Sequence, residues 1–181
     1  VVGTGGGVVS TAANNVSINV PPAAIPSDIV FTITDGGANY LVTTDAGNIN
    51  VILSTTIGPE GTTFAIPATL TFRWPDSNND GVVDGTTFNE NILYLSKDGL
   101  VIAGPCGTDA VHCDMTLNKF TMEVSSLSQF VIGTPIACYT LTLGHTGTGS
   151  NPTATPPNST SCSDGSYLEG ESISLSGAIP A

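Results

Sequence analysis

Basic residues are nearly absent from this chain of 181 residues, which has three Lys and Arg side chains against fifteen Asp and Glu. The formal net charge of −12 at pH 7 excludes a protein that follows nucleic-acid phosphates, because that task needs clustered Lys and Arg. The same imbalance argues against docking on anionic lipid. An acidic surface instead keeps a protein soluble or attracts divalent cations.

Long apolar runs are also missing. No stretch reaches the roughly 18 consecutive apolar residues of a membrane span, so we expect none. The chain begins VVGTGGG, without an initiator Met or a signal-like segment, and we expect a processed protein or a fragment of a longer one.

Charged residues make up 10% of the chain, far below the roughly 25% of an ordinary soluble domain. Thr, Ser, Asn and Gly supply the polarity instead, and these residues suit strands and turns better than helices. The 40% hydrophobic content is enough to fill a core. The composition therefore predicts an all-β protein.

Apolar and polar residues alternate along many short segments, which is the pattern of half-buried strands. Ile29, Phe31 and Ile33 share one face of segment 28–34. Leu70, Phe72 and Trp74 share one face of segment 69–74. Further strands are expected at 16–20, 50–57, 92–96, 119–124, 129–133, 139–143 and 172–177. Short antiparallel strands of this kind are typical of a β-sandwich.

The composition changes near residues 133–138, so we divide the chain there. Residues 1–135 are expected to form an antiparallel β-sandwich, and residues 136–181 a small, incomplete β unit. Within the second part, residues 144–160 are rich in Pro, Thr, Ser, Gly and Asn, and predict a long loop or a mobile connection.

Four cysteines are present, at positions 106, 113, 138 and 162, and none belongs to a CxxC pair. The two histidines lack metal-ligand spacing, so a zinc site is not expected. An even number of cysteines in a β-rich chain favours disulfides and an oxidising compartment. Three pairings are possible, and buried free thiols are the alternative. We favour Cys106 with Cys113 and Cys138 with Cys162.

The segment DSNNDGVVD, residues 76–84, has an oxygen-bearing side chain at nearly every second position. Such spacing lets a short loop surround one Ca²⁺ ion, with Gly81 at the sixth position for a sharp turn. The expected ligands are Asp76, Asn78, Asp80, Val82 through its carbonyl, and Asp84. A metal-free Asx-rich turn is the alternative.

The loop departs from a helical EF-hand, because its twelfth position is Thr87 rather than a bidentate Glu. Strands rather than helices are expected on both sides, and Glu90 is a further candidate carboxylate. The small number of carboxylates suggests weak binding, on the order of 10⁻⁴–10⁻³ M, as in extracellular modules. Such a site would hold a hairpin loop together rather than sense calcium.

The segments VSINVPPAAIPSDIVFTIT, IGPEGTTFAIPATLTFRWP, NENILYLSKDGLVIAG and VSSLSQFVIG occur in this order within the first 135 residues. They resemble the ZU-type β-sandwich domain of ankyrins, netrin receptors and many bacterial surface proteins. The resemblance implies a non-catalytic module. Some members of that family cleave themselves at His-Phe-Ser. Here Ser126 and Leu127 precede Ser128, so no base is provided for the serine and we predict no self-cleavage.

The tail, with YTLT and YLEGESISLSGAIPA, resembles the opening part of an internalin-type B repeat. That resemblance implies further strands that this chain does not contain. Either the chain is a fragment or a neighbouring copy supplies the missing strands by strand addition. A homopolymer is therefore a possible assembly.

Three functions are weighed on these grounds. The favoured one is a non-catalytic structural or adhesive module of a secreted or cell-surface protein. The alternative is a calcium-dependent carbohydrate-binding module, in which Trp74 or Tyr94 stacks on a sugar, although Trp74 alternates in phase with core residues. An enzyme is not expected, because His112, His145, Glu60 and Glu169 lack a supporting motif. Asn15 and Asn158 begin Asn-x-Ser/Thr triplets that a suitable host could glycosylate.

Overall fold

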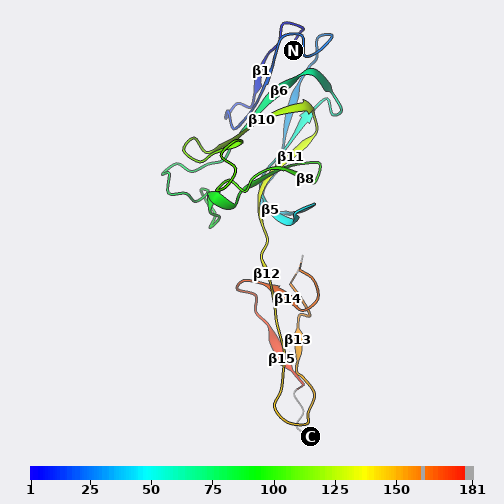
Figure 1. The fold of residues 1–181 in the computed structure, drawn as a ribbon, viewed down its shortest axis with the longest axis vertical. Coiled ribbons are helices and arrows are strands. Elements are labelled where there is room, and N and C mark those ends of the chain that lie inside the picture. Colours follow the sequence, from blue (N-terminus) through cyan, green and yellow to red (C-terminus); the bar gives the residue numbers. More distant parts are fainter. Residues whose placement is uncertain (160–161, 178–181) are drawn as a thin grey trace. The chain divides into compact units, whose positions relative to one another are not determined.

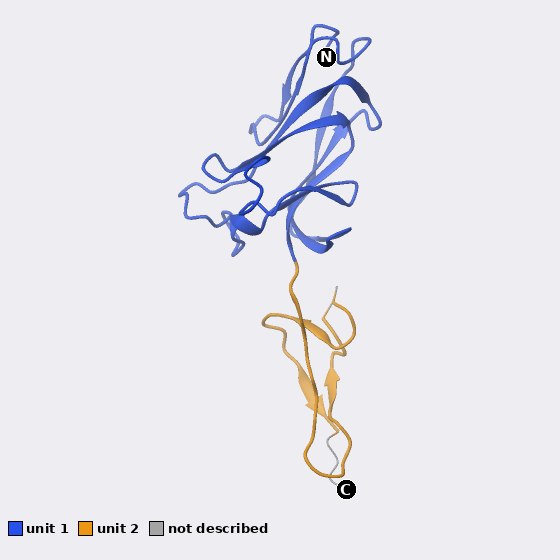
Figure 2. Cartoon of the chain, viewed as in Figure 1, with its two compact units in different colours: residues 1–135 blue, residues 136–181 orange. Residues whose placement is uncertain are grey.

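Antiparallel strands make up nearly all of the regular secondary structure, which confirms the all-β class expected from the alternation (Figure 1). The structure is a computed structural model that describes residues 1–159 and 162–177. The chain divides into two compact units, residues 1–135 and 136–181 (Figure 2). Among the described residues, no helix is long and apolar enough to cross a membrane.

The first sheet of unit 1 has the strand order β1-β2-β6-β10-β9. Its strands are β1 (Gly7–Ser10), β2 (Val16–Val20), β6 (Thr63–Arg73), β10 (Lys119–Ser126) and β9 (Cys113–Asp114). All neighbouring strands are antiparallel, and Phe120 of β10 lies opposite Phe72 of β6. Because side chains alternate across a strand, these two rings share the face that is buried.

The second sheet has the order β3-β5-β11-β7-β8, and β4 pairs with β5 beside β3. Its strands are β3 (Thr32–Gly37), β4 (Leu41–Thr44), β5 (Gly47–Gly58), β11 (Gln129–Pro135), β7 (Tyr94–Lys97) and β8 (Leu100–Ala103). The central pair, β5 and β11, contributes buried apolar residues such as Ile57 and Phe130.

The two sheets of unit 1 enclose one continuous apolar core. Phe72 from the first sheet and Phe130 from the second have ring centroids 5.5 Å apart. Leu70, Phe72 and Trp74 are all buried, as their period-two spacing predicts. Trp74 also packs edge-on against Phe120, with ring centroids 5.4 Å apart. The sandwich predicted for residues 1–135 is therefore present.

Some strand boundaries differ from the prediction. The segment 28–34 begins regular pairing only at Thr32, and Ile29 forms an isolated bridge with Val2. Segment 92–96 was expected to be the strand that directly follows the candidate calcium loop of residues 76–84. Instead a single 3-10 turn, η1 (Glu90–Ile92), precedes β7. Asn89 starts this turn because its side chain accepts a hydrogen bond from the backbone amide of Asn91.

Unit 2 consists of two separate two-stranded antiparallel sheets. One pairs β12 (Cys138–Thr140) with β14 (Ser166–Leu168), and the other pairs β13 (Thr153–Thr155) with β15 (Ser174–Ser176). The prediction of a long loop or a mobile connection over residues 144–160 was wrong at β13. Local composition concealed this strand, because the hydrogen bonds that define it come from β15, about twenty residues later in the chain.

Candidate metal site

The metal loop, defined here as residues 74–93, connects β6 of the first sheet to β7 of the second. It folds back on itself, since the amide of Glu90 donates to the carbonyl of Gly81 at 2.9 Å and the amide of Val83 donates to that of Phe88 at 3.0 Å. Gly81 has a φ of +82°, a conformation that favours glycine. The sharp turn expected at the sixth position is therefore present.

Asp76 closes the beginning of this loop from a buried position with 7% exposure. Its carboxylate accepts hydrogen bonds from the amides of Asp80, at 3.3 Å, and Gly81, at 3.1 Å. The side chain of Asn78 accepts from the amide of Asp80, and the carboxylate of Asp80 accepts from the amide of Val82. Four of the five predicted ligand residues thus form one tight, hydrogen-bonded turn.

Asp84, the fifth predicted ligand, has a different contact. Its carboxylate accepts a hydrogen bond from the amide of Ser77 at 3.0 Å, and its own amide donates to the carbonyl of Pro75. Asp84 does not line the pocket at the loop described below. Its structural role is to close the two ends of the turn.

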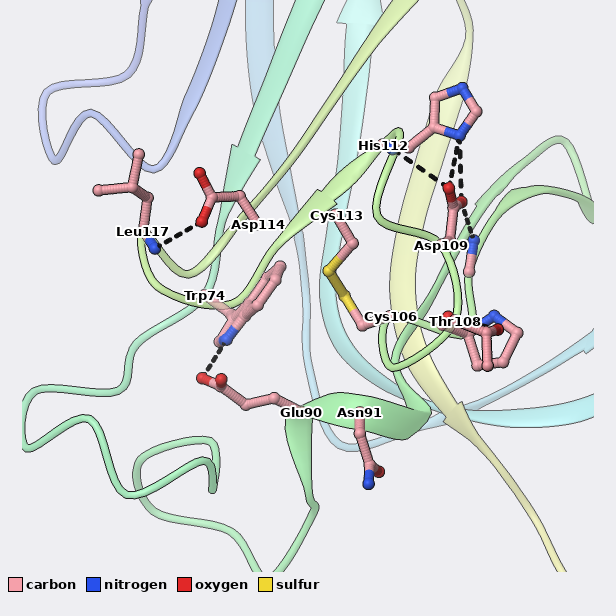
Figure 3. The surroundings of a disulfide bond; sticks show 12 residues. Trp74, Glu90, Asn91, Cys106, Thr108, Asp109, His112, Cys113, Asp114 and Leu117 are labelled. Atoms are coloured by element: carbon pink, nitrogen blue, oxygen red, sulfur yellow. Dashed lines mark hydrogen bonds and ion pairs between the residues drawn. A yellow bond between two sulfur atoms is a disulfide. The ribbon is translucent and has the colours of Figure 1, made fainter.

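Glu90 is the residue at this site that the spacing argument ranked only as a further candidate. The 3-10 turn η1 positions it, and it is 2% exposed. One of its carboxylate oxygens accepts a hydrogen bond from the indole nitrogen of Trp74 (Figure 3). Because Trp74 itself is held against Phe120 in the core, the Glu90 side chain has a fixed support.

Burial raises the pKa of Glu90 above its ordinary value of 4.5, because a carboxylate loses hydration when it leaves water. The hydrogen bond from Trp74 opposes this effect and lowers the pKa. The nearby carboxylates of Asp76 and Asp80 raise it further, since they repel a second negative charge. The net direction of the pKa shift is upward, and burial is its largest cause.

A surface pocket of about 340 Å³ lies over the two buried carboxylates. Its lining residues are Asp76, Asn79, Gly81, Asn89, Glu90, Met115 and Thr116. The turn between β9 and β10 forms one wall. Asn118 attaches that wall to the loop, because its side-chain nitrogen donates to the carbonyl of Asp76 and to the side-chain oxygen of Asn79.

Among the described residues, no Lys or Arg side chain forms an ion pair with Asp76, Asp80 or Glu90. Arg73 donates to the carbonyl of Leu117, and Lys97 donates to the hydroxyl of Ser126. Within residues 1–159 and 162–177, the one ion pair joins His112 to Asp109. Over the same residues, no three Asp, Glu, His or Cys side chains converge as a ready metal centre. The site therefore offers two buried carboxylates, with amide and backbone oxygens beside them.

Each disulfide links one cysteine to the next cysteine along the chain, which is the pairing that we favoured. Cys106 and Cys113 are joined with Cα atoms 5.3 Å apart, and Cys138 and Cys162 with Cα atoms 5.8 Å apart. The first closes a short loop near Trp74 and Glu90 (Figure 3). The second crosses unit 2.

Asp109 braces the loop closed by the first disulfide. Its carboxylate accepts from the amides of Gly104, at 2.8 Å, and His112, at 3.1 Å, and it also contacts the His112 ring. Burial alone raises the pKa of Asp109, but these hydrogen bonds and the His112 ring outweigh it, so the pKa is lowered from 3.8.

The serines and histidines considered for catalysis have other partners. Ser128 donates to the carboxylate of Asp98, and Ser126 accepts from Lys97. His145 contacts the side chain of Asn151. In the second glycosylation triplet, Asn158 donates through its side-chain nitrogen to the carbonyls of Ser159 and Cys162. The last residue of that triplet, 160, lies outside the described residues.

A comparison with known families finds a match at the start of the chain. Residues 1–86 match the ZU5 domain family. The match runs from the N-terminus through β6 and into the metal loop, and it supports the ZU-type domain inferred from segment order. ZU5 domains are protein-interaction modules, which fits a non-catalytic structural module. A search of the curated proteins finds no match to this chain.

Proposed function

We propose that this protein is a calcium-stabilised structural module of an extracellular or cell-surface assembly. The observation that carries the proposal is the burial of Asp76 and Glu90 beside each other in the metal loop without a basic partner. Two such carboxylates repel each other, and burial adds a desolvation cost for each charge. A divalent cation would remove both costs at once.

Calcium is the cation that suits these groups, because it prefers carboxylate, amide and carbonyl oxygens and tolerates irregular coordination. The proposed ligands are the carboxylates of Asp76 and Glu90, with oxygens of Asn78, Asp80 and Val82. Glu90 would supply the carboxylate that position twelve lacks. Asp84 stays a predicted ligand whose role the experiment below decides.

A cation here would stabilise the connection between the two sheets. The metal loop spans residues 74–93, which is longer than most connections in compact domains. Trp74 anchors the start of the loop in the core, and it also holds Glu90 near the end of the loop by a hydrogen bond. A cation bound by Asp76 and Glu90 would therefore attach both ends of the loop to the sandwich. The role that follows is mechanical stabilisation, with no chemical step.

Location outside the cell is supported by the two disulfides, because such bonds persist mainly in oxidising compartments. Assembly by strand addition is supported by unit 2, because each of its two sheets has two strands within the described residues 136–159 and 162–177. The B-repeat resemblance and the bacterial-surface origin belong to the same proposal.

The position of Trp74 argues against the carbohydrate-binding alternative. It required an exposed aromatic side chain beside the cation, and Trp74 is 3% exposed and donates its indole hydrogen to Glu90. Its ring faces the protein core and is not available to stack on a sugar.

Thermal unfolding with about 10 mM calcium and with excess chelator tests the metal role. At the expected affinity, calcium stabilises the folded state by about 1.4–2.7 kcal/mol. Glu90→Gln should remove this gain while leaving the metal-free protein at least as stable, because a buried charge is lost. Glu123→Gln, an exposed carboxylate on β10, is the matched control.

The outcomes are distinct. A calcium response that survives Glu90→Gln excludes Glu90 as a ligand, and no response in the parent protein excludes the site altogether. Asp84→Asn tests whether Asp84 is a direct ligand or a residue that only closes the turn. Loss of the calcium response in this variant would make Asp84 a ligand, and a response that is kept would leave Asp84 with the closing role alone.

A further inference from the structure

The sandwich has four sheet edges, and three of them carry features that prevent pairing with another strand. β9 is two residues long and ends the first sheet within the disulfide loop. β3 contains a bulge after Asp35, which also places a charge on the edge. Short strands, bulges and charges are the usual means of protecting sheet edges.

The opposite edge of the second sheet is protected by a single aspartate. Asp45 lies in the turn between β4 and β5. Its amide donates to the carbonyl of Gly99 at 2.9 Å, and its carboxylate accepts from the amide of Val101 of β8 at 2.7 Å. A backbone donor of β8 is thereby occupied, and the tip of the β4–β5 hairpin covers the end of this edge.

The fourth edge, β1, pairs with β2 alone among the strands of the described chain. The β1–β2 register, continued one residue beyond Ser10 and Ser17, places Thr11 opposite Val16. The amide of Thr11 donates to the carbonyl of Val16 at 3.0 Å, so these two residues form a hydrogen-bonded pair. Such pairs alternate along an antiparallel ladder, so Val9 is in the next one. The backbone groups of Val8 and Ser10 therefore point away from β2.

This edge also lacks the charges that protect the others. None of residues 1–27 has a charged side chain, although the whole chain has a net charge of −12. Val8 is 68% exposed, and β1 contains no proline. An uncharged edge with an exposed β-branched residue is a template for another strand.

We propose that β1 pairs with β1 of a second copy of this chain, antiparallel and two-fold symmetric, so that two first sheets become one continuous sheet. A second copy can meet this edge without repulsion between carboxylates at the contact, whereas elsewhere two copies would bring like-charged acidic surfaces together. Residues 1–27 contain no Asp or Glu, so this segment brings no carboxylates together across a β1–β1 contact. This inference rests on the assembly role proposed above and assigns that role to the sandwich as well as to unit 2.

Sedimentation equilibrium of the whole chain over a range of concentrations tests the pairing. We expect a reversible dimer in the parent protein. Val8→Lys should raise the dimer dissociation constant by about tenfold or more, because each copy then adds a positive charge to an otherwise uncharged contact. Val111→Lys, at a valine that is 85% exposed in the disulfide loop, adds the same charge elsewhere and should leave the constant unchanged.

Ser10→Pro gives a second test that does not depend on charge. It removes an outward amide while keeping the ladder with β2, so it should also weaken the dimer. Unfolding midpoints near that of the parent protein show that both variants fold. Association that is unaffected by Val8→Lys and Ser10→Pro overturns the inference.

Leu175→Lys distinguishes the failure of this inference from failure of the assembly role. Leu175 is 56% exposed on β15 of unit 2. Association lost in Leu175→Lys but kept in the β1 variants overturns pairing at β1 and keeps strand addition through unit 2. A parent protein that stays monomeric at every concentration overturns both.

Discussion

Both units are rich in Thr, Ser and Gly and contain antiparallel strands, but they have different means of stabilisation. Unit 1 buries apolar side chains from both sheets in one core, with Phe72, Phe120 and Phe130 fully buried. In the described part of unit 2, Tyr167 is the one buried apolar side chain. Two-stranded sheets are marginally stable by themselves, so we expect unit 2 to depend on the disulfide between Cys138 and Cys162. Strand-forming composition therefore does not by itself produce a core.

The largest effect is expected in the core of unit 1. Phe72→Ala should reduce the free energy of unfolding of this unit by about 3–5 kcal/mol, because it leaves a cavity between the sheets. Denaturant unfolding measures the loss, and exposed Val111→Ala should stay within about 0.5 kcal/mol of the parent protein. A loss near that of the control would show that unit 1 is not held by this core.

The next effect separates the units by their disulfides. Replacing Cys138 and Cys162 by Ala should remove about 2–4 kcal/mol of stability from unit 2, which has little buried apolar surface to compensate. Amide hydrogen exchange should then show loss of protection in β12 and β14, with β5 and β11 still protected.

Replacing Cys106 and Cys113 in the same way is the matched comparison. Unit 1 should be destabilised but stay folded, because its core does not depend on that bond. If unit 2 kept its protection without its disulfide, the contrast between a core-stabilised and a disulfide-stabilised unit would be wrong.

The smallest effect is a pH dependence confined to the loop of unit 1 closed by the first disulfide. The folded-state pKa of Asp109 is lowered, so its contribution to stability is present above the unfolded pKa of 3.8 and disappears as the pH falls through the folded value. Urea midpoints measured between about pH 6 and pH 2.5 should decline in the acid range. Asp109→Asn should flatten that part of the decline, and an unchanged profile in this variant would contradict the assignment.

Period-two alternation predicted the buried faces of the long strands well. Leu70, Phe72 and Trp74 are buried as a set, because the side-chain period of a strand does not depend on its partner. Strands β1, β4, β8, β9, β13 and β14 were not predicted. Each is two to four residues long and has too few positions to show alternation, so its pairing is set by a neighbouring strand.

The candidate site was predicted in part for the same kind of reason. The turn from Asp76 to Val82 follows from local spacing, since a glycine and closely spaced oxygen acceptors favour one compact turn. The burial of Glu90 does not follow from spacing. It depends on Trp74, sixteen residues earlier in the chain, and on a 3-10 turn where a strand was expected.

The sequence by itself determined the all-β class, the position of the tight Asp- and Asn-rich turn, the change of texture near residue 135 and the scarcity of positive charge. These properties depend on composition or on neighbours within a few residues. The tertiary structure decided which strand edges are protected, which carboxylates are buried together and which unit has a core. These depend on contacts between distant segments, whose free energies no local pattern contains.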